Sequence, residues 1–103
     1  MRITVLTPDQ EIFNGPITSV KVPGVLGEFQ VLKNHAPIVS SLEAGKVQIV
    51  TAAGEHRIFN DETGSVQTSD MPGRTITFQI SGGFIEVLNN EVSLLVRGVS
   101  NIA

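Results

Sequence analysis

The chain has 103 residues, with seven basic and ten acidic side chains, a net charge of −3 and no cysteine. This length accommodates one domain with a single core, and the lack of cysteine excludes disulfides, thiolate metal centres and a thiol nucleophile. The basic residues are scattered singly, which argues against a nucleic-acid surface. No apolar run approaches the roughly 20 residues that span a bilayer, and the polar start is unlike a signal peptide, so we expect a soluble domain on the cytosolic side.

Branched side chains dominate the apolar residues. Valine, isoleucine and threonine number 31 against 12 leucines plus alanines, and this bias favours strands over helices. Strands are predicted, in chain order, at Arg2–Leu6, Ile17–Val22, Glu28–Val31, Ile38–Ser41, Lys46–Thr51, Glu55–Phe59, Arg74–Ile80, Phe84–Leu88 and Val92–Arg97. The clearest signal lies in the seventh of these, where Ile76, Phe78 and Ile80 alternate with polar residues. Many short strands separated by turns are typical of a β-sandwich or flattened barrel.

Glycine, proline and asparagine mark the predicted turns between these strands. Turns are expected at Asn14–Pro16, Pro23–Gly24, Gly27, Ala44–Gly45, Ala53–Gly54, Pro72–Gly73 and Asn89–Asn90. The asparagine pair predicts a two-residue hairpin turn, because asparagine tolerates left-handed backbone. The region from Asn60 to Met71 breaks the strand pattern, since its first 11 residues contain one apolar side chain, three acids and no base. It is predicted to be an exposed, mobile loop.

The chain offers little for catalysis. His35 and His56 lie in no nucleophile elbow and in no metal-ligand spacing, so both are predicted to be surface or loop histidines. The acids of the loop, Asp61, Glu62 and Asp70, are the one candidate for a cation site or a small metal-dependent hydrolase, but solvated loop charge is the better interpretation. No catalytic residue, metal or cofactor is expected. The residues indicate a binding or assembly module, with a free-standing β-sandwich module for a small ligand or carbohydrate as the alternative.

Three segments carry more information than the composition. They are Thr7–Gly15, Val22–Pro37 and Ser81–Val87, which include a Gly-Glu pair, a His-Ala-Pro triplet and a Ser-Gly-Gly-x-x-Glu-Val run. Together they resemble the epsilon subunit of bacterial F-type ATP synthases, called delta in mitochondria, over residues 3 to about 97. The resemblance implies an all-β, flattened β-sandwich of about ten strands. It also implies a non-catalytic rotor subunit that couples rotation of the membrane c ring to the gamma shaft and the catalytic head during ATP synthesis.

The resemblance assigns the first candidate interface to the c ring. Its residues are Gly27, Glu28 and Phe29. There the Glu28 carboxylate would face basic or amide groups on the polar loops of the ring. Members of the family usually have a small Leu-Gly pair where this chain has Phe29 and Gln30.

The second candidate interface faces gamma. Its residues are His35, Ala36, Pro37, Ile38, Val39, Ser40 and Ser41. Pro37 would make this segment rigid, and Asn34, which stands where the family usually has glycine, can keep left-handed backbone. Ser81, Gly82 and Gly83 are interpreted as a tight bend before a strand that begins at Phe84. The resemblance implies a peripheral protein at the cytoplasmic face of the bacterial plasma membrane, not inserted in the bilayer. The rotation would be driven by a flow of protons or sodium ions.

Two departures from the family pattern concern its length. Residues 51–73 hold roughly twenty residues more than a typical member, and we expect an extra hairpin there, formed by Glu55–Phe59 and Arg74–Phe78 beside the acidic loop. Typical members continue into a C-terminal helical hairpin that inhibits ATP hydrolysis in several bacteria. This chain stops at Ala103, so the expectation is a single β-sandwich domain over residues 1–103 without that self-inhibition.

Overall fold

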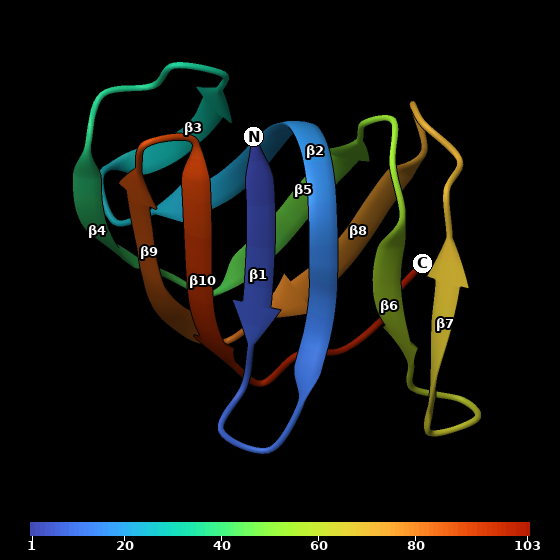
Figure 1. Ribbon diagram of the computed structural model, residues 1–103. Coiled ribbons are helices and arrows are strands. Elements are labelled where there is room, and N and C mark those ends of the chain that lie inside the picture. Colours follow the sequence, from blue (N-terminus) through green and yellow to red (C-terminus); the bar gives the residue numbers. More distant parts are fainter.

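The computed structural model describes all residues from 1 to 103 and contains ten strands and no helix, hence no helix able to cross a bilayer (Figure 1). The strands are β1 (Arg2–Leu6), β2 (Glu11–Gly24), β3 (Gly27–Leu32), β4 (Ile38–Leu42), β5 (Gly45–Thr51), β6 (His56–Asn60), β7 (Ser65–Ser69), β8 (Thr75–Ile80), β9 (Gly82–Leu88) and β10 (Glu91–Arg97). The prediction of an all-β fold of about ten strands is confirmed. Eight strands lie within two residues of their predicted ends, whereas β2 begins six residues before its predicted start and β7 was not predicted.

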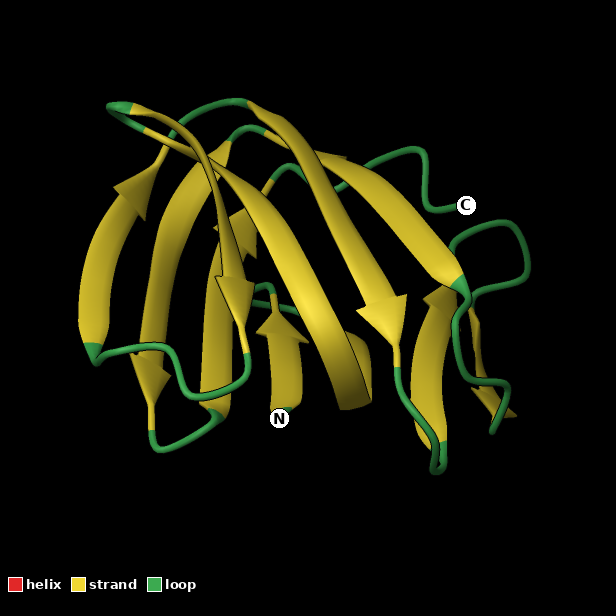
Figure 2. Ribbon diagram, turned by 90° about the horizontal axis from the view of Figure 1, so that it is seen from above, coloured by secondary structure: helices red, strands yellow, loops and turns green.

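The strands form two packed layers that share the long strand β2. One layer contains β4, β9, β10, β1, the first half of β2, β6 and β7, and the other contains β3, the second half of β2, β5 and β8. In Figure 1, β2 rises beside β1, bends over the top and passes behind β1 and β10. Seen from above, the strands of both layers curve around one interior, with the loops at their ends (Figure 2). All pairings are antiparallel except that of β1 with β10, which is parallel.

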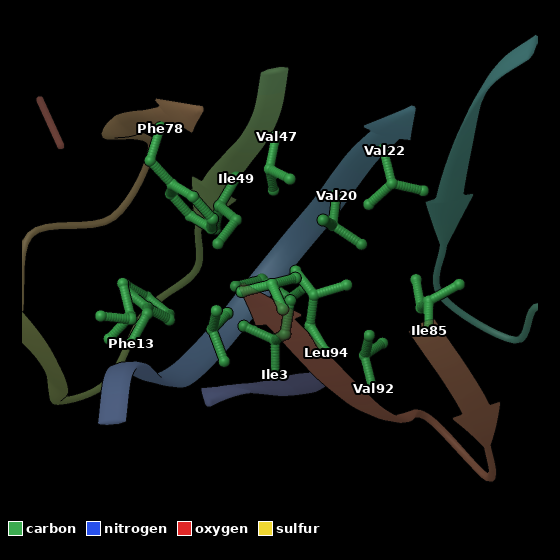
Figure 3. Packing of buried hydrophobic residues seen from close by; sticks show 14 of the residues in the cluster. Ile3, Phe13, Val20, Val22, Val47, Ile49, Phe78, Ile85, Val92 and Leu94 are labelled. Carbon is green, nitrogen blue, oxygen red and sulfur yellow. The ribbon is translucent and has the colours of Figure 1, made fainter. Parts of the chain in front are cut away.

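The core between the layers is a cluster of 20 buried aliphatic and aromatic side chains, to which every strand except β7 contributes. Figure 3 shows Val47, Ile49 and Phe78 of β5 and β8 facing Ile3 and Leu94 of β1 and β10. Most of these are valines and isoleucines at alternate positions, as a half-buried strand requires. Each such side chain contributes about 1.5–3 kcal/mol when it is fully buried.

The predicted turn at Asn14–Pro16 is wrong, because these residues lie inside β2. Pro16 is the last β2 residue paired with β1, opposite Arg2, and Ile17 is the first paired with β5. Proline and glycine therefore mark the point where β2 passes from one layer to the other. Gly15 is needed for close packing, since a Cβ there would lie 2.2 Å from the Cβ of His56.

The predicted loop from Asn60 to Met71 is also partly wrong. Residues 61–68 are exposed, as expected, but Ser65–Ser69 forms β7 and pairs with β6. The predicted pairing of Glu55–Phe59 with Arg74–Phe78 does not occur, because β6 pairs with β7 and β2 while β8 pairs with β5. The sequence did not reveal β7 because it packs nothing into the core and so lacks the apolar alternation of the other strands.

Thr51 fixes the segment that leads from β7 to β8. Its buried hydroxyl donates to the Met71 carbonyl at 2.8 Å and accepts from the Arg74 N–H at 2.9 Å. Replacing Thr51 by valine keeps the shape and leaves two partly buried backbone groups without partners, so the free energy of unfolding should fall by about 1–3 kcal/mol. In urea denaturation, the control Thr18→Val, at an exposed site, should change stability much less. Equal effects would show that the Thr51 hydroxyl does not hold this segment.

Strand β9 begins at Gly82, two residues before the predicted start. Gly83 allows β9 to lie close to β10, since a Cβ there would lie 2.2 Å from the Leu95 carbonyl oxygen. Gly83→Ala is therefore expected to lower the free energy of unfolding by about 2 kcal/mol or more. The control is Gly64→Ala, where a Cβ meets no atom and only the positive φ of 69° is unfavourable. A Gly83→Ala protein as stable in urea as the Gly64→Ala protein would contradict this packing.

Candidate functional site

The residues predicted to face the c ring lie at the tip of the β2–β3 hairpin. The turn consists of Val25 and Leu26, whose exposures of 52% and 104% leave two apolar side chains in solvent. Glu28 is also exposed, and its carboxylate lies 4.0 Å from the Lys21 ammonium, too far for a strong ion pair. Phe29 is different, because its ring packs against Gly24 and the core. The hairpin tip (Val25–Glu28) thus presents apolar and acidic groups on a backbone that Phe29 supports.

The first residues predicted to face gamma form the β3–β4 loop. His35 lies in this loop, as predicted, and its N–H donates to the Leu32 carbonyl at 3.1 Å. Asn34 has a φ of 65°, which confirms that it keeps left-handed backbone. Its N–H donates to the Asn90 Oδ1 at 2.7 Å, and the Asn90 side-chain amide donates back to the Asn34 Oδ1 at 3.2 Å. The loop is thereby attached to the β9–β10 turn, where Asn89 and Asn90 both have positive φ, as predicted.

The remaining residues predicted to face gamma lie on β4, and the fold brings this strand beside the hairpin tip. The Val25 N–H points to the Ser41 carbonyl at 3.4 Å, and the Glu43 N–H donates to the Pro23 carbonyl at 2.8 Å. A surface hollow of about 650 Å³ lies between the two segments, lined by Val39, Ser40 and Ser41 and by residues 24–29. The two predicted interfaces are therefore continuous at one end of the sandwich.

An exposed apolar stripe, which was not predicted from the sequence, crosses the outer face of the first layer. The stripe consists of Leu6, Leu95, Phe84 and Val39, with exposures of 37%, 51%, 55% and 73%. Leu6 pairs with Leu95 and Leu95 with Phe84, so these three side chains lie in a row across β1, β10 and β9. Two hollows of about 400 and 340 Å³ border the row, and the second includes Val39. A signal for the stripe was present in the sequence, because β1, β10, β9 and β4 each carry an apolar residue at a position that faces outward.

His56 was predicted to lie on the surface or in a loop, and this is wrong, because the side chain is fully buried. Its ring stacks on Phe13, with centroids 5.3 Å apart and an angle of 24° between the planes. Burial and then the nearby Arg74 lower the pKa of the imidazole, and Asp70 partly offsets this effect. Neither ring nitrogen has a hydrogen-bond partner.

The structure offers no metal centre. No group of three or more His, Cys, Asp or Glu side chains is placed to hold a metal ion. Asp61 and Glu62 lie in the β6–β7 turn, whereas Asp70 follows the far end of β7. The acids considered for a hydrolase are thus separated along the hairpin and do not converge.

Comparison with known proteins agrees with the β-sandwich fold. Residues 1–70 match the family model "ATP synthase, Delta/Epsilon chain, beta-sandwich domain". The ATP synthase epsilon chain of Chlorobaculum tepidum is 39% identical over 98 residues, which cover 95% of this chain and 90% of that protein. The epsilon chain of Salinibacter ruber is 32% identical over 99 residues, and here the match covers 96% of this chain but only 59% of the relative.

Two solved structures share the fold. A chain of the Euglena gracilis mitochondrial ATP synthase, in a structure of its OSCP, F1 and c-ring, superposes with a TM-score of 0.69 at 21% identity, covering 95% of this chain and 51% of that one. A chain from the central stalk and c-ring of the Tetrahymena thermophila enzyme gives 0.66 at 17% identity, covering 98% and 66%. With the family model and the relatives, these matches identify the chain as a member of the ATP synthase delta/epsilon chain family, in its β-sandwich domain.

Proposed function

We propose that this chain is a non-catalytic subunit of the central stalk of an F-type ATP synthase, where it couples rotation of the c ring to the gamma shaft and the catalytic head. Its family membership supports this role, as do relatives named ATP synthase epsilon chain and fold neighbours from a central stalk and c-ring. The chain would work at the cytoplasmic face of the plasma membrane as a peripheral subunit. Residues 51–73 would be an addition to a single domain.

The observation that carries the proposal is the apolar stripe. Exposed aliphatic and aromatic side chains lie in one row, bordered by hollows, on the rigid face of a sheet. Protein interfaces typically have such an apolar centre, often with an aromatic anchor, surrounded by polar groups. Phe84 would be this anchor, with Leu95 beside it. The predicted gamma-facing residues His35–Ser41 meet the stripe at one end, because Val39 belongs to both sets.

The hairpin tip would contact the c ring, because it combines exposed apolar side chains with the Glu28 carboxylate. Torque passes through such a contact only if the backbone is stiff. Phe29 provides this stiffness by packing under Gly24, and the backbone bonds to β4 add to it. A subunit held on both surfaces transmits rotation without chemistry of its own.

The proposal is tested by measuring the binding of the purified chain to the gamma subunit of its own enzyme by isothermal titration calorimetry. We expect the chain and gamma to form a one-to-one complex. This complex should then bind the c ring. A chain that binds neither gamma nor the gamma–c-ring assembly would exclude the rotor role.

Glu28→Ala tests the c-ring contact separately. An exposed acid contributes little to stability, so the melting temperature should change by about 1–2 °C or less. Proton-driven or sodium-driven ATP synthesis by the reconstituted enzyme should fall about threefold or more if the carboxylate loses a polar partner in the interface. The matched control is Glu62→Ala, an exposed acid in the β6–β7 turn. Equal synthesis rates in the two variants would count against the assignment of the tip.

A further inference from the structure

The β6–β7 hairpin contains a feature that the rotor role does not use. His56 is fully buried, and both its ring nitrogens lack a hydrogen-bond partner. A neutral imidazole carries one N–H and one acceptor nitrogen, so this site leaves both unsatisfied, which is unfavourable inside a protein. In Figure 1 the hairpin lies on the side of the molecule opposite β4, away from the gamma-facing strand.

The hairpin is attached to the rest of the sandwich by few contacts. Strand β6 pairs with β2 at only two positions, Phe13 with Ile58 and Asn14 with Arg57, and β7 pairs with β6 alone. The side chains that β6 buries fully are His56 and Ile58, and the half-buried Phe59 also packs against the core. The ring of His56 covers Phe13. A charge on His56 would therefore weaken the docking of the hairpin.

The charges around His56 do not provide a partner for a proton. Arg74, in the segment before β8, disfavours the imidazolium, and Asp70, in the segment after β7, favours it without a hydrogen bond. The remaining neighbours on the packed elements are Glu55 and Arg57, both exposed, and Glu11 of β2, which accepts a 3.2 Å bond from Arg57 on the outer side. An imidazolium at this position would be a buried cation with two unmet donors.

We propose that the β6–β7 hairpin is an acid-released flap: protonation of His56 detaches it from β2 and uncovers Phe13, while the two-layer sandwich stays folded. The released histidine has the ordinary pKa of about 6.5, and the docked histidine has a lower one. Docking is therefore at full strength above pH 6.5 and weakens as the pH falls below that value, because the released form binds the proton more tightly. Release would expose the edge of β2 that β6 covers, so this edge would be accessible only at acidic pH.

The test is amide hydrogen exchange of the 103-residue chain by NMR between pH 8 and pH 5, corrected for the intrinsic exchange rate at each pH. Protection in β6 and β7 should fall up to about tenfold per pH unit below about 6.5, whereas protection in β5 and β9 should stay constant. Simultaneous loss of protection in all strands would be ordinary acid unfolding and would overturn the proposal.

Two further measurements show whether His56 is the cause. His56→Phe replaces the ring by an apolar one of similar shape, and its hairpin should stay protected at pH 5, whereas the control His35→Phe should behave like the unaltered chain. In the unaltered chain, the imidazole resonances of His56 should titrate below pH 6.5, over the range in which the hairpin loses protection. If His56→Phe retains the full pH dependence, or if His56 titrates at or above 6.5, the proposal is wrong; the titration decides the matter even if the variant folds poorly.

Discussion

Replacing Phe78 by alanine is expected to lower the free energy of unfolding by about 3–5 kcal/mol, the largest stability change foreseen for this chain. The ring is 1% exposed and lies on β8, facing the core alongside Val47 and Ile49 (Figure 3). The substitution loses the free energy gained by burying the ring, and it leaves a cavity that the surrounding strands fill only in part. Urea denaturation followed by circular dichroism measures the change.

The control is Phe84→Ala, which deletes the same atoms from the outward-facing side of β9 in the other layer. Phe84 is 55% exposed, so its loss should cost about 1 kcal/mol or less. A similar loss of stability in both variants would mean that β8 does not face the core. A change that is large only for Phe84→Ala would reverse the assignment of the two faces.

The second large effect concerns binding. Leu95→Glu places a carboxylate at the middle of the apolar stripe, between Leu6 and Phe84. Burying this charge in an apolar contact without a partner is costly, so the affinity for gamma should fall by at least about 30-fold. The side chain is 51% exposed in the free chain, and the stability of the free chain should therefore change little.

Val66→Glu is the matched control, since Val66 is 52% exposed and lies on β7, the one strand that contributes nothing to the core. Calorimetric titration with gamma should give nearly the same affinity as the unaltered chain. If both glutamates weaken binding equally, the stripe is not the contact and the effect is one of net charge.

The fold could be predicted where burial imposes alternation on the sequence. Ile76, Phe78 and Ile80 show this clearly, and asparagine identified the turn at Asn89–Asn90 because few other residues accept that backbone. Prediction failed where a strand lacks a buried face, as in β7. It also failed in β2, where Gly15 and Pro16 serve the crossing between layers and not a turn.

The candidate site is predicted only through resemblance. Composition alone does not distinguish Glu28 from other exposed acids, and Phe84 and Leu95 resemble core residues unless the face of each strand is known. His56 did carry a signal, since it lies two residues before the buried Ile58 and hence on the same face of β6. The general preference of histidine for partly exposed positions argues against burial and outweighs this signal.

Hydrogen exchange of the chain before and after assembly with gamma and the c ring tests the rotor role most directly. Exchange should slow in the outer strands beside the stripe (β1, β10, β9 and β4) and at the hairpin tip, while β7 exchanges as it does in the free chain. Slowing confined to β6 and β7, with no change at the stripe or the tip, would contradict the proposed contacts.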